Sequence, residues 1–180
     1  MTTQTVAAST PGTAPALRRL YFVRFGFALV WAGLLFATAS TLGPVSVTLL
    51  VLYPLFDVAA AVVDVRSTRG ATTGLSVNIA VSVLAAVGLA VAVTSGIPAV
   101  LRVWGAWAVL SGLTQLVVGI SRRRLGGQWA MIVSGAISVV AGTSFVLQAG
   151  QADPSLVSLA GYATLGGVFF LVSALRLGRR

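Results

Sequence analysis

The chain has 180 residues, of which 57% are hydrophobic and 8% are charged, and its net charge is +9. Soluble domains carry about 25% charged residues, so this composition and a mean hydropathy of +0.99 exclude a soluble globular domain. Histidine, cysteine, lysine and glutamate are absent, which excludes disulfides, thiol nucleophiles and Ser-His-Asp catalysis. We therefore predict an integral membrane protein that is not an enzyme and has no cofactor and no metal site.

Residues 1–17 are rich in threonine, alanine and proline without any periodicity, and they predict a disordered cytoplasmic tail. The rest of the chain, 18–180, predicts one transmembrane domain, because about 20 apolar residues cross a bilayer core. Six spans are expected, at approximately 20–40, 45–65, 75–95, 98–120, 128–148 and 155–175. Arg18-Arg19 before an apolar run also resembles a signal peptide, but cleavage would leave five spans.

Eleven of the twelve arginines fall into four clusters, with two apolar runs between successive clusters. The clusters are Arg18, Arg19 and Arg24; Arg66 and Arg69; Arg122, Arg123 and Arg124; and Arg176, Arg179 and Arg180. Positive charges collect in cytoplasmic loops, so the pattern predicts that both termini lie in the cytoplasm. The clusters also predict contact with anionic inner-leaflet lipids. Their spread over four loop ends, without interleaved aromatic residues, argues against nucleic-acid binding.

An internal repeat of about 55 residues divides the chain into three units, approximately 18–70, 71–127 and 128–180. The period is set by three glycines and three prolines: Gly33, Gly88, Gly142, Pro44, Pro98 and Pro154. The repeat superimposes three segments that begin at Tyr53, Trp107 and Tyr162. Because each unit holds two spans, all copies enter the membrane in the same direction, and the fold class is three parallel two-helix repeats.

Small residues at four-residue spacing predict close packing between the spans. They are Ala130, Ser134, Ser138 and Gly142 in the fifth span, and Gly88, Ala92 and Gly96 in the third. The sequence leaves open a homo-oligomer or another membrane partner.

Glycine and tryptophan motifs between Leu101 and Leu177 carry a resemblance to a known family. They are Trp104-Gly105, Ser111-Gly112, the Arg122–Arg124 loop leading to Gly127, Trp129, Ser134-Gly135, Ala141-Gly142, Gly161-Tyr162 and Gly166-Gly167. On these residues the chain resembles the HdeD-like acid-resistance membrane proteins, which are built from short two-helix repeats. The resemblance implies a bacterial cytoplasmic-membrane protein with a role in acid or envelope stress tolerance. It supplies no catalytic or binding residues.

Asp57 is the strongest candidate for a functional residue, because it stands mid-span where the other two repeats have Ser111 and Gly166. An ionised carboxylate at that depth costs at least about 2.5 kcal/mol unless it is paired, hydrated or protonated. We therefore expect a polar cluster that opens to the cytoplasm. Its predicted members are Arg24, Asp57, Asp64, Asn78 and Gln115.

Two interpretations of this cluster stay open. It is either a proton-responsive or ligand-binding cavity, as in a transporter of protons or a small solute, or a structural ion pair. In the second case Arg24 pairs with Asp57 or Asp64 and fixes the first hairpin, and the protein can be a non-transporting scaffold or accessory subunit.

Overall fold

The computed structural model describes residues 13–68, 73–121, 124 and 129–177, and these residues form six long helices and one short 3-10 turn. The elements are α1 Thr13–Ala37, α2 Pro44–Thr68, α3 Thr73–Ala92, η1 Val93–Ser95, α4 Ile97–Ser121, α5 Trp129–Gln148 and α6 Val157–Leu177. All six helices are long and apolar enough to cross a membrane. The prediction of an all-α, multi-pass membrane protein is therefore confirmed.

The helix ends follow local sequence signals with one difference from the prediction. Pro44 begins α2 and Pro98 lies in the first turn of α4, where the missing proline N–H is not needed. Gly96 precedes α4 with a φ of 92°, a conformation that glycine adopts at little cost. α1 begins at Thr13, inside the segment 1–17 that we predicted to be disordered, because Ala14, Ala16 and Leu17 are good helix formers. Residues 1–12 lie outside the described residues.

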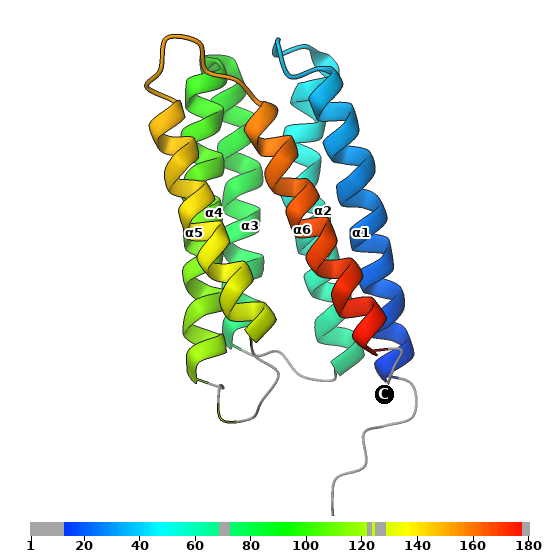
Figure 1. Ribbon diagram of the computed structural model, residues 1–180. Helices are drawn as coiled ribbons and strands as arrows, with labels where there is room; N and C mark the ends of the chain where they lie inside the picture. The colour runs from blue at the N-terminus through cyan, green and yellow to red at the C-terminus, as the bar shows by residue number, and fades with distance from the viewer. Residues whose placement is uncertain (1–12, 69–72, 122–123, 125–128, 178–180) are drawn as a thin grey trace, which may run out of the picture.

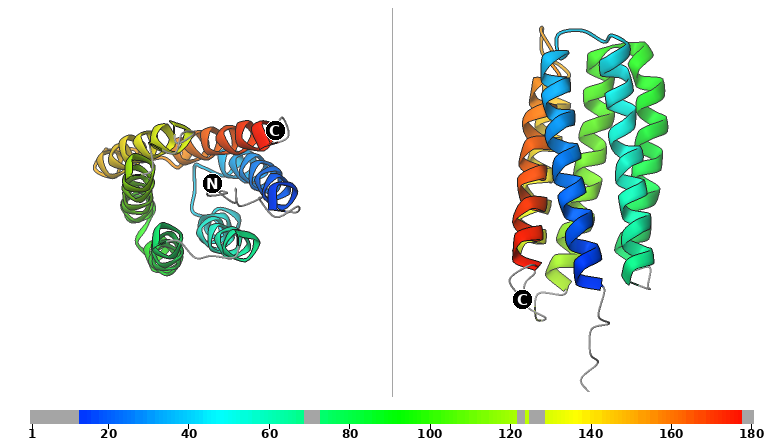
Figure 2. Two further views of the ribbon diagram at one scale, coloured as in Figure 1. Left: turned by 90° about the horizontal axis from the view of Figure 1, so that it is seen from below. Right: turned by 90° about the vertical axis from the view of Figure 1, so that its right-hand side faces the viewer.

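The six helices follow one another around a ring (Figure 1; Figure 2). The most extensive contacts are between α4 and α5, between α6 and α1, and between α2 and α3. α6 therefore closes the ring by packing on α1, and the contact between α5 and α6 is the sparse one. The first residues of α1 and the last residues of α6 lie at the same end of the bundle (Figure 1).

Aromatic rings fill the core toward the end of the bundle opposite the chain termini. Trp31 and Trp104 stack with ring centroids 5.3 Å apart, and Tyr53 lies 4.6 Å from Trp31. Trp31 also donates from Nε1 to the carbonyl oxygen of Leu49 at 2.7 Å. This layer is completed by fully buried aliphatic residues: Leu35, Leu50, Val100, Leu101, Leu156 and Leu159. The core at this end is packed.

Glycines bring α4 and α5 together. A Cβ atom at Gly105 would lie 2.5 Å from the carbonyl oxygen of Gly142, so the two backbones are in direct contact. The same close approach recurs seven residues away, where Gly112 faces Gly135. The row that packs is thus spaced by seven residues, which is nearly two full turns. Ser138 and Gly142 of the predicted four-residue row do pack on α4, and Gly135, which that row omits, contacts α4 as well.

The periodic glycines do not share one structural role. Gly142 contacts backbone, and Gly88 faces a methyl group of Val103, which would lie 3.1 Å from an added Cβ. Gly33 faces open space, with nothing within 4 Å of an added Cβ. The sequence period therefore does not translate into three equal helix contacts.

Candidate functional site

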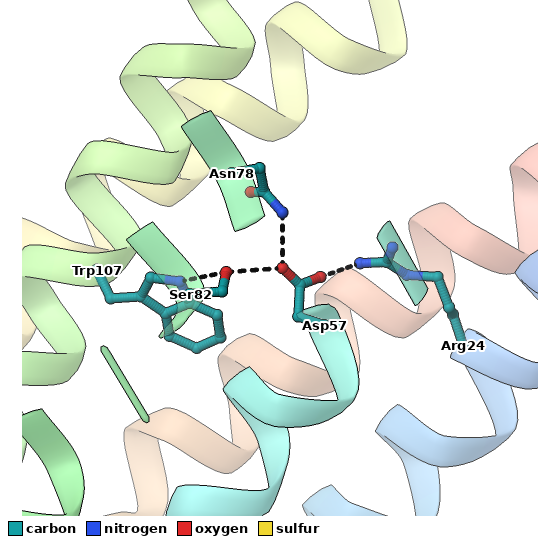
Figure 3. A network of polar contacts seen from close by, with 5 residues as sticks. All are labelled: Arg24, Asp57, Asn78, Ser82 and Trp107. Atoms are coloured by element: carbon teal, nitrogen blue, oxygen red, sulfur yellow. Dashed lines mark hydrogen bonds and ion pairs between the residues drawn. The ribbon is translucent and has the colours of Figure 1, made fainter. Parts of the chain in front are cut away.

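Asp57 lies near the middle of α2 and binds side chains from two other helices (Figure 3). Its Oδ1 atom forms an ion pair with Nη2 of Arg24 on α1. Its Oδ2 atom accepts hydrogen bonds from Nδ2 of Asn78 at 2.8 Å and from Oγ of Ser82 at 2.9 Å, both on α3. Both carboxylate oxygens are therefore satisfied, and one side chain links α1, α2 and α3.

Ser82 extends this network to a fourth helix. Nε1 of Trp107 on α4 donates to Oγ of Ser82 at 3.1 Å, while the Ser82 hydroxyl donates to Asp57 (Figure 3). Successive hydrogen bonds of this kind polarise and strengthen one another in a low-dielectric interior. We call the five residues Arg24, Asp57, Asn78, Ser82 and Trp107 the Asp57 network.

Arg24 is contacted on one face by an aromatic ring from α6. The guanidinium carbon lies 4.2 Å from the ring centroid of Phe170, a cation–π geometry. Its Nε atom is buried and has no hydrogen-bond partner among the described residues. A guanidinium has five N–H donors, so Asp57 satisfies only part of this group.

The Asp57 network is largely enclosed. The Arg24 and Asp57 side chains keep 18% and 12% of their surface exposed, and Ser82 is completely buried. We expected a cluster that opens to the cytoplasm, whereas α1, α2 and α3 pack around the carboxylate and leave it little exposed surface. The same packing explains why the carboxylate takes its partners from protein donors.

The structure brings together three of the five predicted residues, namely Arg24, Asp57 and Asn78. Asp64 is half-buried on α2, about two turns from Asp57, and lies within electrostatic range of Arg24. Gln115 makes no hydrogen bond to the Asp57 network within the described part of the chain. It packs at the contact between α4 and α5, where a Cβ on Gly135 would lie 3.1 Å from Cβ of Gln115.

Sequence reasoning missed Ser82 and Trp107. Ser82 lies four residues after Asn78, and residues at that spacing share one face of a helix. That spacing is the signal that would have found Ser82, once Asn78 had been selected. Trp107 gave no such signal, because a tryptophan in an apolar span is ordinarily part of the core.

A second aromatic–serine contact lies between α5 and α6. The hydroxyl groups of Tyr162 and Ser138 are 2.8 Å apart, and the Tyr162 ring packs edge-on against Phe145. Trp107 and Tyr162 are positions that the sequence repeat superimposes, and each one hydrogen-bonds to a serine on the preceding helix. The two contacts support the packing of the second and third hairpins in a similar way.

The chemistry available at the Asp57 network is limited to charge and hydrogen bonding. Within residues 13–68, 73–121, 124 and 129–177, no group of three His, Cys, Asp or Glu side chains could hold a metal ion. The network contains one carboxylate beside one permanent positive charge. The chain matches no protein-family model, no curated protein and no solved structure.

Proposed function

We propose that this protein acts in acid or envelope stress tolerance in the bacterial cytoplasmic membrane, without enzymatic chemistry. The resemblance to the HdeD-like proteins implies this role. The observation that carries the proposal is the part-buried ion pair between Arg24 and Asp57. A proton on Asp57 would remove the charge that neutralises Arg24, and the network ties α1, α2, α3 and α4 together. Acid would therefore act on a contact that four helices share.

We also propose that both chain termini face the cytoplasm and that the fold consists of three parallel two-helix repeats. The described arginines of the four clusters support this orientation, because they lie toward the end of the bundle where α1 begins and α6 ends: Arg18, Arg19, Arg24, Arg66, Arg124 and Arg176. The positive-inside rule assigns that end to the cytoplasm. The repeats are supported by the ring, in which the closest helix contacts join successive hairpins.

The arginines at the start of α1 are suited to anionic lipid headgroups. Arg18 and Arg19 are exposed and line a surface hollow together with Phe22, whose ring centroid lies 5.6 Å from the Arg18 guanidinium carbon. Basic residues at the cytoplasmic surface each gain about 1 kcal/mol from anionic lipids. The bilayer is thus the partner that we propose for this surface.

Acid survival of a deletion strain tests the proposed role. The strain is complemented with wild type, with Asp57→Asn and with the matched control Asp64→Asn, all at equal membrane levels. We expect wild type and Asp64→Asn to restore survival and Asp57→Asn to fail. Equal rescue by Asp57→Asn would reduce Asp57 to a structural role. Failure of wild type to rescue would remove the assignment to acid tolerance.

A second candidate function is transport of protons or a small solute. The observation that favours it is the partly satisfied guanidinium of Arg24, whose Nε atom is buried without a partner among the described residues. Reconstituted liposomes that contain a pH-sensitive dye would then show a flux that Asp57→Asn abolishes. No flux, together with stable co-purification of another membrane protein, would instead identify a scaffold or accessory subunit.

A further inference from the structure

Arg24 carries more hydrogen-bonding capacity than the protein uses. Nη2 is paired with Asp57, and Nε is buried without a partner among the described residues (Figure 3). The Phe170 ring covers one face of the guanidinium, and its N–H donors point outward along the edge. The Arg24 side chain keeps 18% of its surface exposed.

The positive charge of Arg24 is compensated by a carboxylate, and a carboxylate can become neutral. An arginine keeps its positive charge under all physiological conditions, whereas a carboxylate loses its negative charge when it takes up a proton. If Asp57 takes up a proton, a permanent cation is left in the interior of the bundle without its paired anion. Such a charge is strongly unfavourable in a membrane unless another anion or water compensates it.

Among the described residues, four other titratable groups lie near the pair. Tyr53 on α2 and Tyr162 on α6 lie within electrostatic range of Asp57, and both are ordinarily neutral. Tyr21 on α1 and Asp64 on α2 lie within electrostatic range of Arg24. Asp64 is the one carboxylate among them, and it lies about two turns along α2 from Asp57. The neighbours from α3 and α4 are Asn78, Ser82 and Trp107, which are donors without charge.

We propose that Arg24 is a binding site for a small monovalent oxyanion of the carboxylate type, which is occupied when Asp57 carries a proton. The edge of a guanidinium presents parallel N–H donors that match the two oxygens of a carboxylate. Binding of one proton and one monovalent anion leaves the net charge of the interior unchanged. The site thus couples proton uptake to anion binding in a ratio of one to one.

This inference goes beyond the proposed stress role, because it concerns binding to the purified protein and needs no survival phenotype. Asp57→Asn is the central variant, since asparagine is always neutral and leaves Arg24 without its counter-charge. The matched control is the double variant Arg24→Gln with Asp57→Asn, which removes the cation as well. Formate is the probe at pH 7.5, with the bulky gluconate used to keep ionic strength constant.

The thermal midpoint of each detergent-solubilised protein is measured against formate concentration. We expect a saturable rise for Asp57→Asn, with an apparent affinity at least tenfold higher than for wild type, and no rise for the double variant. No rise for Asp57→Asn, or an equal rise for the double variant, would overturn the proposal. An equal response to chloride would overturn the oxyanion class of the ligand.

A second measurement on wild type keeps the proposal testable if Asp57→Asn fails to fold. Nitrate is the probe here, because it is planar, monovalent and charged at both pH values used. We expect wild type to bind nitrate at least tenfold more tightly at pH 5 than at pH 7.5, and Arg24→Gln to lose this difference. A nitrate affinity that is the same at both pH values would contradict coupling to a proton.

Discussion

Gly112 on α4 and Gly135 on α5 touch through their backbones. A Cβ atom at Gly112 would lie 2.6 Å from the carbonyl oxygen of Gly135, and a Cβ atom at Gly135 would lie 2.8 Å from the carbonyl oxygen of Gly112. Backbone atoms cannot move aside as a flexible side chain can. Close approach of this kind is how helices associate in lipid, where no hydrophobic drive favours their contact.

Gly112→Ala is therefore expected to destabilise the protein. Overpacking of a tight contact costs about 1–3 kcal/mol, which outweighs the roughly 0.5–1 kcal/mol that alanine gains over glycine in a helix. Gly161→Ala on α6 is the control, because nothing lies within 4 Å of its added Cβ. Thermal unfolding in one detergent should show a lower midpoint for Gly112→Ala and an unchanged or higher midpoint for Gly161→Ala. Equal midpoints would contradict the backbone contact.

The two buried tryptophans of α4 should respond differently to replacement by phenylalanine. Trp107 donates to Ser82, whereas Nε1 of Trp104 has no hydrogen-bond partner among the described residues. Both substitutions remove similar volume, so the difference between them reports the hydrogen bond of Trp107 together with the unpartnered N–H of Trp104. We expect Trp107→Phe to lose about 0.5–1.5 kcal/mol more than Trp104→Phe in the free energy of unfolding. A greater loss for Trp104→Phe would be inconsistent with the network.

Removal of one member of the ion pair should lower the free energy of unfolding strongly, because the other charge is left without its partner. Arg24→Met leaves Asp57 without its cation, and Asp57→Leu leaves Arg24 without its anion, each at a cost of about 3–5 kcal/mol. The double variant leaves neither charge. We expect it to be more stable than the sum of the two single effects predicts, with a coupling of about 0.5–3 kcal/mol. Equilibrium unfolding of all four proteins measures this, and purely additive effects would exclude the direct pair.

The hydrogen bond between Tyr162 and Ser138 supports the sparse contact between α5 and α6. Tyr162→Phe and Ser138→Ala should each lower the free energy of unfolding by about 1 kcal/mol, and the double variant should add little to either. The control is Thr164→Val, which removes only a bond within α6, to the carbonyl oxygen of Ala160. A loss for Thr164→Val as large as for Tyr162→Phe would indicate that helix stability alone is being measured.

The proposed orientation can be tested with single cysteines, because the sequence contains no cysteine of its own. Gln151→Cys places an exposed thiol at the end of the bundle opposite the termini, and Ala16→Cys places one near the start of α1. A membrane-impermeant maleimide should label Gln151→Cys in intact spheroplasts and Ala16→Cys only after permeabilisation. The reverse pattern would place the termini outside.

Much of the fold could be predicted from sequence because each span satisfies a simple length requirement. About 20 apolar residues must cross the bilayer, and the boundaries of five helices follow from where such runs end, whereas α1 begins at Thr13, before its apolar run. Because a buried charge needs a partner, the sequence predicted an ion pair of Arg24. It left two pairings open, with Asp57 or with Asp64. In the structure Arg24 forms an ion pair with Asp57.

The rest of the site depended on how each helix is rotated about its axis. One residue turns a helix by about 100°, so depth in the membrane does not fix the direction of a side chain. Gln115 has a suitable depth, but the glycine contacts of α4 turn it toward Gly135 on α5. Ser82 has the rotation that the site needs, and serine is too common in apolar helices to be selected by type.

The packing of α6 on α1 has a consequence for how the molecule is assembled. Gly167 on α6 lies against Ala28 and Phe25 on α1, and the two helix ends nearest the termini lie at the same end of the bundle (Figure 2). During synthesis the face of α1 that carries Ala28 therefore lacks its partner until the sixth helix has been made. The ring is completed only by this last insertion. A circular permutant, with α6 joined to α1 by a short loop and new termini between α1 and α2, would keep every helix neighbour. Only the order in which the helices are synthesised would change.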